Sequence, residues 1–343
     1  MIFYLFGLLL FLILGYGYSR DKYSQINLFS CTTLFLYFVF IFTFRNHTVG
    51  TDTIAYIQNF NTEFDGYEFG FRLINLILKK LHLSHFSLFF IISSITFILF
   101  SKSFYRENMY LLFPLLYIIM FVPSFNIQRQ IFALSFAFYG IKLNNRNSIF
   151  LFIIGFFIHK SIMFYFLIYL MSRIVKVSQK FYYVFGVFLL FVSFSGKILD
   201  LLLVLIDFTP YAEYRWIVFN NVSFSVSVVL YIKLILYYML FFYVDVINDS
   251  KKRSLYNILI SCMIVAEVAV KMNPIFFRLQ VLFSPVLLLG VECVLCKVHK
   301  EKSLKHKVYL CVLVGYTVFA FYLNLNMGVN QIIPYSLMNC YEL

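Results

Sequence analysis

Apolar segments long enough to cross a lipid bilayer recur along this chain from its first residues to about residue 326. A membrane-spanning helix needs about 20 predominantly apolar residues. The pattern predicts spans at residues 2–18, 26–44, 86–101, 109–123, 127–143, 181–194, 226–247, 256–270, 275–295 and 308–326. We therefore predict an all-α, polytopic integral membrane protein of about 10–12 transmembrane helices.

A further apolar stretch, residues 149–171, carries the polar residues His159, Lys160 and Ser161 at its middle. A charge at the bilayer centre is unfavourable by about 2.5–3.5 kcal/mol on insertion scales, and unwound backbone is tolerated there only beside a wet cavity. The stretch is therefore predicted to be a broken helix, two half-helices that turn back near residue 159.

The distribution of basic residues supports that hairpin. With two crossings in residues 149–171, one side of the membrane receives 17 of the 28 Lys and Arg residues, in the loops at 20–22, 102–106, 142–146, 173–180, 251–253 and 297–307. The opposite side receives 10. Because cytoplasmic loops carry the excess of Lys and Arg, we predict that the second side, with both termini, is extracytoplasmic.

No boundary between domains is visible, so residues 1–343 are predicted to form a single transmembrane domain with outer loops at about 45–85 and 195–225. Within the first loop, residues 67–81 mix apolar and charged positions as an amphipathic helix at the membrane interface does. Residues 2–18 have no charged n-region and no cleavage site, so they are predicted to remain as a helix.

Composition restricts the function. The chain is 62% hydrophobic and 22% aromatic, with a mean hydropathy of +0.86. A net charge of +13 would suggest nucleic acid in a soluble protein, but here the basic residues set membrane orientation, so no nucleic acid is expected. No GxSxG, HExxH, P-loop or dinucleotide fingerprint occurs. Neither a metal site nor a cofactor is predicted.

Polar residues on the outer side are the candidates for chemistry. After a turn allowed by Gly50, Asp52 and Tyr56 lie on one face of a short helix, where Asp52 is either a cap or a group that binds a sugar hydroxyl. Gln128 and Arg129 begin a span, where free N–H groups and the helix dipole favour an anion. The fork of Arg129 suits phosphate oxygens.

The other candidates follow the same logic. Arg278, with Gln280 nearby, lies one turn into a late span, and Arg45 closes the second span. His159 and Lys160 lie at the predicted break. Arg215 lies in the second outer loop beside Tyr214 and Trp216, which form either an interfacial aromatic belt or a sugar-stacking surface. Arginines at these positions either snorkel to the interface or bind an anionic substrate.

The chain resembles the bacterial surface polysaccharide polymerases of the EpsG-like, O-antigen polymerase (Wzy) type. The resemblance rests on VGTDTIAYIQNF, YEFGFRLINLIL, NIQRQIFALSFAFYGIKL, FFIHKSIMFYFLIYL, FFRLQVLFSPVLLL and IIPYSLMN, which follow one another over most of the chain. It implies a GT-C-like membrane glycosyltransferase of the bacterial inner membrane with its active site outside. Such an enzyme polymerises undecaprenyl-diphosphate-linked repeat units into O-antigen, capsule or exopolysaccharide, and a chain-length regulator is a further partner.

Under this hypothesis Arg45, Arg129 and Arg278 bind the donor diphosphate and stabilise the charge of the leaving group. His159 or Asp52 takes the proton of the acceptor hydroxyl, and the pKa of an ordinary histidine, near 6.5, suits that step. Tyr56, Gln128, Lys160, Arg215 and Gln280 contact the glycan. The alternatives are a flippase for lipid-linked oligosaccharide, which should show two similar halves, and a membrane acyltransferase with His159 as its base.

Overall fold

The structure, a computed structural model, describes residues 2–20, 25–50, 52–62, 66–174, 178–195, 228–272 and 276–326. Over these ranges the chain forms helices and no strand, so the all-α prediction is confirmed. In this part of the chain seven helical stretches are long and apolar enough to cross a membrane: Ile2–Arg20, Gln25–Thr43, His85–Ser103, Arg106–Phe125, Ser250–Val270, Arg278–Glu301 and Leu304–Leu325. The chain divides into two compact units, unit 1 (residues 1–167 and 314–343) and unit 2 (residues 168–313).

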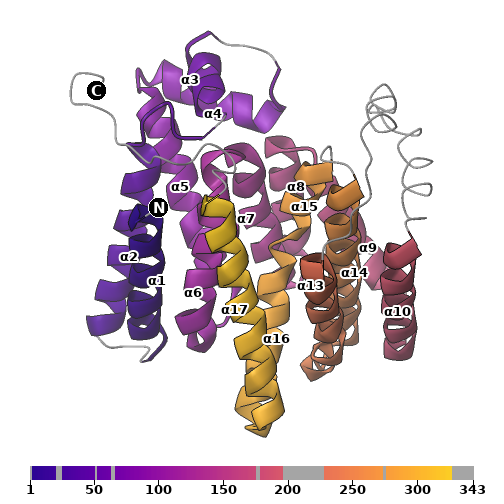
Figure 1. Ribbon diagram of the computed structural model, residues 1–343. Helices are drawn as coiled ribbons and strands as arrows, with labels where there is room; N and C mark the ends of the chain where they lie inside the picture. The colour runs from indigo at the N-terminus through magenta and orange to yellow at the C-terminus, as the bar shows by residue number, and fades with distance from the viewer. Residues whose placement is uncertain are drawn as a thin grey trace. The chain divides into compact units, whose positions relative to one another are not determined.

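Unit 1 contains the first nine α-helices, the last of them in part, and the end of α17 (Figure 1). The helices are α1 (Ile2–Arg20), α2 (Gln25–Thr43), α3 (Thr53–Thr62), α4 (Phe69–Lys80), α5 (His85–Ser103), α6 (Met109–Leu116), α7 (Gln128–Leu143), α8 (Asn147–Ile158) and α9 (Ile162–Ile174). Short turns of 3₁₀ or π type lie at Arg106–Asn108, Tyr117–Phe121 and Pro123–Phe125.

The predicted broken helix is present as α8 and α9. The rings of Phe152 and Phe166 lie 6.0 Å apart, whereas in one continuous helix 14 residues would separate them by about 21 Å. The backbone of His159 is extended, with φ −154° and ψ 120°. Gly155 lies against Ile162 of α9 and the Ala133 carbonyl oxygen of α7. The two half-helices therefore fold back on each other beside α7.

The basic loops of unit 1 gather at one end of its helices. Arg106 donates a hydrogen bond of 3.0 Å to the Tyr18 carbonyl oxygen, so the loop before α6 lies beside the end of α1. The Lys142 ammonium lies 3.0 Å from the centre of the Tyr105 ring, which brings the end of α7 to the same place. This arrangement agrees with the predicted sidedness of the loops at 102–106 and 142–146, and residues 21–22 of the loop at 20–22 lie outside the described residues.

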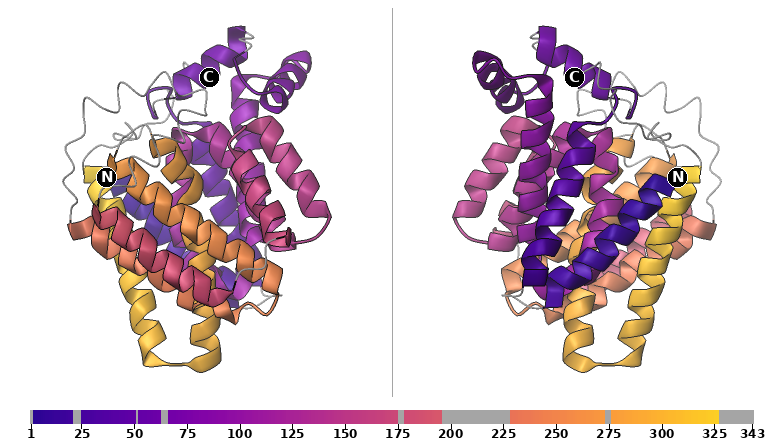
Figure 2. Two further views of the ribbon diagram at one scale, coloured as in Figure 1. Left: turned by 90° about the vertical axis from the view of Figure 1, so that its right-hand side faces the viewer. Right: turned by 90° about the vertical axis from the view of Figure 1, so that its left-hand side faces the viewer.

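Helices α3 and α4 lie over the opposite end of unit 1, as Figures 1 and 2 show. The prediction of an amphipathic helix over residues 67–81 is confirmed by α4. The side chain of Asn75 donates to that of Asn59 at 3.1 Å, which joins α4 to α3. Gly70 approaches the backbone of Phe157, because a Cβ at that position would lie 2.9 Å from the carbonyl carbon of Phe157. The predicted outer loop at residues 45–85 is thus a folded helical segment, and the one at 195–225 lies almost entirely outside the described residues.

Unit 2 contains the end of α9, the start of α17 and the helices between them that the structure describes. These are α10 (Gln179–Ser195), α13 (Val228–Met239), α14 (Ser250–Met272), α15 (Phe277–Phe283), α16 (Val286–Glu301) and α17 (Leu304–Asn326). Within this unit α16 and the start of α17 form a helical hairpin, visible in Figure 2.

Some predicted spans differ from the observed helices. The predicted span 226–247 is interrupted, since α13 ends at Met239 and 3₁₀ turns follow at Leu240–Phe242 and Val244–Val246. Helices α7 and α10, both predicted as spans, have 16 and 17 residues. At a rise of 1.5 Å per residue they are about 24–26 Å long, shorter than the hydrocarbon core of about 30 Å.

Candidate functional site

Arg45 lies two residues after the end of α2 and is completely enclosed in unit 1, with 0% of its surface exposed. Its Nη1 donates to the Phe42 carbonyl oxygen at 2.7 Å and its Nε to the Thr53 hydroxyl at 3.2 Å. Its Nη2 lies 3.5 Å from Oε1 of Gln128. The rings of Phe42, Phe89 and Phe125 surround the guanidinium. Arg45 therefore joins the ends of α2, α3 and α7 and is closed to a ligand in this structure.

Arg129 lies one residue into α7 and enters a group of aromatic rings contributed by α3, α4 and the residues just before α4. Its guanidinium carbon is 3.8 Å from the centre of the Tyr67 ring and 5.9 and 5.7 Å from those of Tyr56 and Phe71. A cation over an aromatic face is attracted by the ring quadrupole. The side chain is 19% exposed, so Arg129 is accessible where Arg45 is not.

Glu68, the residue before α4, is the ionic partner of Arg129. Its Oε2 lies 2.5 Å from Nη1 of Arg129, and the glutamate side chain is 14% exposed. Its Oε1 accepts a hydrogen bond of 3.3 Å from the backbone N–H of Lys160. One carboxylate thus contacts the start of α7 and the turn between α8 and α9.

The turn between α8 and α9 orients the His159 ring. The backbone N–H of Ser161 donates to Nδ1 of His159 at 3.3 Å, and the Ser161 hydroxyl lies 2.8 Å from the same nitrogen. Because a backbone N–H can only donate, Nδ1 is the acceptor, and the neutral ring carries its proton on Nε2. His159 is half-buried, and the side chain of Lys160 is exposed.

Asp52 and Tyr56 lie beside the same aromatic group, at the start of α3. Burial raises the pKa of Tyr56, and the negative charge of Asp52 adds to that shift while the Arg129 guanidinium opposes it. Burial likewise raises the pKa of Tyr67, with the same opposition from Arg129. Both phenols therefore stay protonated at neutral pH and remain hydrogen-bond donors.

In unit 2, α15 carries Arg278, whose side chain is exposed, and Gln280. Gln280 donates from Nε2 to Oε2 of Glu267 on α14 at 2.8 Å. The same oxygen pairs with the ammonium of Lys233 on α13. An ion pair inside apolar helices is rare and is a candidate functional group by default. Arg215 lies outside the described residues.

Comparison with known proteins gives the family. A model of the EpsG family matches residues 28–337, which is most of the chain. The chain belongs to the EpsG family. No curated protein and no solved structure matches it. Membership of the EpsG family indicates a membrane polysaccharide polymerase, in agreement with the apolar helices of both units. The relation to the GT-C fold stays a prediction.

In this EpsG-family chain, the structure brings part of the predicted site together at one end of unit 1. Arg129 and Tyr56 meet directly, Gln128 joins them to Arg45, and the turn of His159 and Lys160 is reached through Glu68. Asp52 lies near enough to act on Tyr56 electrostatically. The other two predicted residues that the structure describes, Arg278 and Gln280, belong to unit 2.

Sequence reasoning missed the partners of these residues. Glu68 and Tyr67 precede an amphipathic helix, and nothing local indicates that they enclose an arginine 61 residues away. For Glu267 and Lys233 a signal existed, because each is an isolated charge in an apolar helix, and such charges usually pair with one another.

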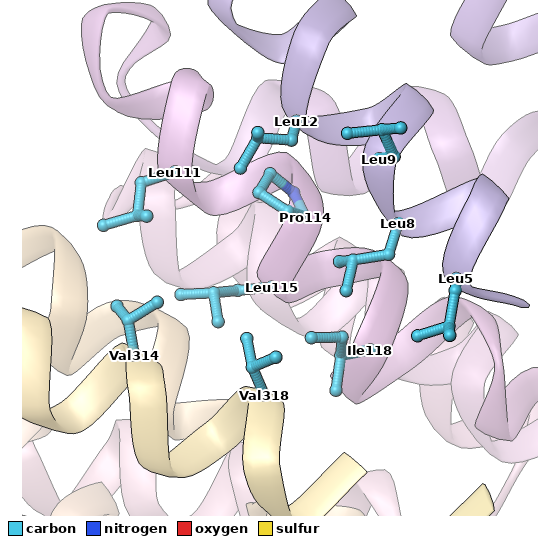
Figure 3. Close-up of a pocket in the computed structure, with 10 residues that line it drawn as sticks. All are labelled: Leu5, Leu8, Leu9, Leu12, Leu111, Pro114, Leu115, Ile118, Val314 and Val318. Carbon is cyan, nitrogen blue, oxygen red and sulfur yellow. The ribbon is translucent and has the colours of Figure 1, made fainter. Parts of the chain in front are cut away.

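An aliphatic cavity of about 280 Å³ lies elsewhere in unit 1 of this EpsG-family chain (Figure 3). It is lined by Leu5, Leu8, Leu9, Leu12, Leu111, Pro114, Leu115, Ile118, Val314 and Val318. The lining offers neither a charged nor a polar side chain, so the cavity is suited only to hydrocarbon.

Proposed function

We propose that this chain is a glycosyltransferase that polymerises undecaprenyl-diphosphate-linked oligosaccharide units at the outer face of the inner membrane. The growing glycan passes from its lipid diphosphate to the end of a new lipid-linked unit. Family membership supports polymerisation, and the observation that carries the proposed donor chemistry is the position of Arg129. It lies at the N-terminus of the largely buried helix α7, is 19% exposed, and contacts the rings of Tyr67, Tyr56 and Phe71.

Arg129 has the chemistry that a diphosphate requires. A guanidinium forms two parallel hydrogen bonds with phosphate oxygens, and the first N–H groups of α7 add the positive end of a helix dipole. These groups would stabilise the charge that develops as the diphosphate leaves, which is often the largest single term in catalysis. For Arg278 on α15, in unit 2, phosphate binding is kept as a separate proposal from the sequence.

The remaining roles are assigned by position. Because Arg45 is enclosed and hydrogen-bonded, we assign it the role of holding Gln128 and α3 in place instead of binding phosphate. Tyr56, Lys160 and Gln280, with Arg215, are proposed to contact the glycan. Position does not assign the base: the sequence names His159 and Asp52, and His159, whose Nδ1 accepts the Ser161 N–H, is suited to donate a hydrogen bond through Nε2.

The test is a reconstituted assay with purified protein and lipid-linked repeat units. Wild-type protein is expected to lengthen the lipid-linked glycan, whereas a flippase would only move it across the vesicle membrane. Arg129→Ala should lower turnover by about 10²–10³, the usual effect of removing one group that stabilises transition-state charge. Arg129→Lys should recover only part of this, since lysine lacks the fork.

Arg146→Ala is the matched control. Arg146 is an exposed arginine of the loop at the opposite end of α7 and α8, so its removal should leave turnover unchanged. Equal losses in both variants would mean that Arg129 acts only through net charge or folding, and the assignment would be withdrawn.

A further inference from the structure

Glu68 occupies the place on Arg129 that the proposed function gives to a phosphate. Its Oε2 accepts a hydrogen bond from Nη1 of Arg129, and its Oε1 accepts one from the backbone N–H of Lys160. The carboxylate is 14% exposed and comes from the residue before α4, whereas both of its partners belong to the α7–α8–α9 group. A protein carboxylate therefore already shows that this position accepts an anion.

The position has a donor that Glu68 does not use. Nε of Arg129 is buried and has no hydrogen-bond partner among the described residues. A buried donor of this kind is normally satisfied. A diphosphate, which has more oxygens than a carboxylate, could accept from this nitrogen as well as from the start of α7.

The predicted base His159 is poorly placed for that role. Its Nδ1 accepts the N–H of Ser161, so in the neutral ring Nε2 already holds a proton. Glu68 is a carboxylate, which can accept a proton directly, and it lies against the proposed donor site.

We propose that Glu68 is a catalytic residue: the donor diphosphate displaces it from Arg129, and the released carboxylate takes the proton of the acceptor hydroxyl. This step rests on the proposed function. The acceptor oxygen forms a bond to the anomeric carbon of the donor sugar. The bond from that carbon to the diphosphate oxygen breaks, and the diphosphate leaves with the electron pair while the proton stays on Glu68.

Because the diphosphate must displace Glu68 from Arg129, the donor has to bind before the proton can be transferred. While Glu68 is paired with Arg129 its charge is neutralised and its oxygens are occupied, so no base is available. Once the diphosphate has taken Arg129, two anions share the site, and this like-charge proximity favours proton uptake by the carboxylate. The base therefore becomes active only when a donor is bound, so the acceptor hydroxyl is not deprotonated in the absence of a donor.

Binding tests the exchange. The probe is a short-chain isoprenyl diphosphate, titrated against the full-length protein in nanodiscs. Glu68→Gln removes the competing charge and should tighten binding about 3–10-fold, whereas Arg129→Gln should weaken it at least 10-fold. Weaker probe binding by E68Q would mean that Glu68 only supports the site, and it would overturn the exchange.

Turnover tests the proton transfer. In the reconstituted assay E68Q should lose about 10²–10⁴ in rate, the range expected for a general base, while it still binds the probe. Glu68→Asp keeps a carboxylate and should retain more turnover than E68Q. Glu107→Gln, a change of an exposed carboxylate beside α6, is the control and should be silent. Turnover of E68Q within threefold of wild type would refute the catalytic role.

The two proposals fail in different ways. If wild-type protein does not lengthen lipid-linked glycan, the proposed function is wrong whatever E68Q does. If wild type is active and E68Q is equally active, only the role of Glu68 is lost. Should E68Q fail to fold, E68D decides the matter: it must bind the probe and turn over more slowly, and wild-type kinetics would contradict the proposal.

Discussion

Arg45 and Arg129 lie at the same end of unit 1, and their surroundings give them different tasks. Arg45 is fully enclosed, with its guanidinium bonded to a backbone carbonyl and a threonine hydroxyl and packed among phenylalanine rings. Arg129 is partly exposed, and its one ionic partner among the described residues is a carboxylate that a stronger anion could replace. The first arrangement stabilises the fold, and the second is suited to binding.

Substitution by leucine should separate the two tasks. Arg45→Leu leaves the Phe42 carbonyl and the Thr53 hydroxyl with a lost donor in a closed site, where an unsatisfied group costs about 1–3 kcal/mol. We expect a lower midpoint of thermal unfolding in detergent. Arg129→Leu should lower that midpoint less, because the Glu68 side chain that it leaves unpaired is 14% exposed and can be hydrated, and it should lower turnover by about 10²–10³, as Arg129→Ala does.

The measurement is a pair of unfolding curves read beside the polymerase assay. Arg45→Lys is the finer variant, because lysine keeps the charge but neither stacks like a guanidinium nor donates from a planar fork. An Arg45→Leu protein as stable as wild type would show that the enclosure contributes nothing.

At the scale of the elements, the α8–α9 hairpin holds the turn of His159 in place. Helix α8 has 12 residues and is about 18 Å long, too short to cross a hydrocarbon core of about 30 Å. Its polar turn must therefore lie against other protein groups or water. Gly155 permits this, because α7, α8 and α9 meet at its Cα without a side chain between them.

Gly155→Val should disturb this meeting point. The added Cβ would lie 3.0 Å from the Ala133 carbonyl oxygen and 3.2 Å from Cγ2 of Ile162, and overpacking of this kind costs about 1–3 kcal/mol. We expect lower thermal stability and reduced turnover. Gly315→Val on α17 is the matched control, since nothing lies within 4 Å of its added Cβ. Equal effects at both positions would mean that helix propensity alone is responsible.

In unit 2 the ion pair of Glu267 and Lys233 plays the corresponding part, because it ties α13 and α14 to Gln280 of α15. Glu267→Leu should destabilise the protein by about 3 kcal/mol, since it leaves a partly buried ammonium without its partner. The double variant Lys233→Met, Glu267→Leu should recover much of that loss in unfolding experiments. A double variant no more stable than the single one would indicate that the pair is needed for reasons other than charge balance.

Over the whole molecule, the features that could be predicted from the sequence are those that depend on residues close together in the chain. The helical class, the amphipathic α4 and the break at His159 each follow from residues close together in the chain, and each is confirmed. The pairing of Glu68 with Arg129 and the enclosure of Arg45 could not be predicted, because they depend on how segments 61 and 83 residues apart pack. The same holds for the division into two units.

The orientation of the protein in the membrane is a further prediction that can be tested. In unit 1 the basic loops at 102–106 and 142–146 lie at one end, and α3 and α4 lie at the other (Figure 1), where Arg129 contacts Tyr56 and Tyr67. The positive-inside rule places the basic end in the cytoplasm. Residue Ser84, exposed between α4 and α5, should then face outward, and Asn147, exposed at the start of α8, should face the cytoplasm.

Single cysteines at these two positions, in a variant whose six native cysteines are replaced, test this orientation in intact cells. A membrane-impermeant maleimide should label Ser84→Cys at once and Asn147→Cys only after the cells are permeabilised. The opposite pattern would place Arg129 and Glu68 at the cytoplasmic face, where a lipid-linked glycan displayed outside could not reach them. Because both residues are exposed and neither belongs to the site, polymer production by each variant confirms that the labelled protein is folded and correctly inserted.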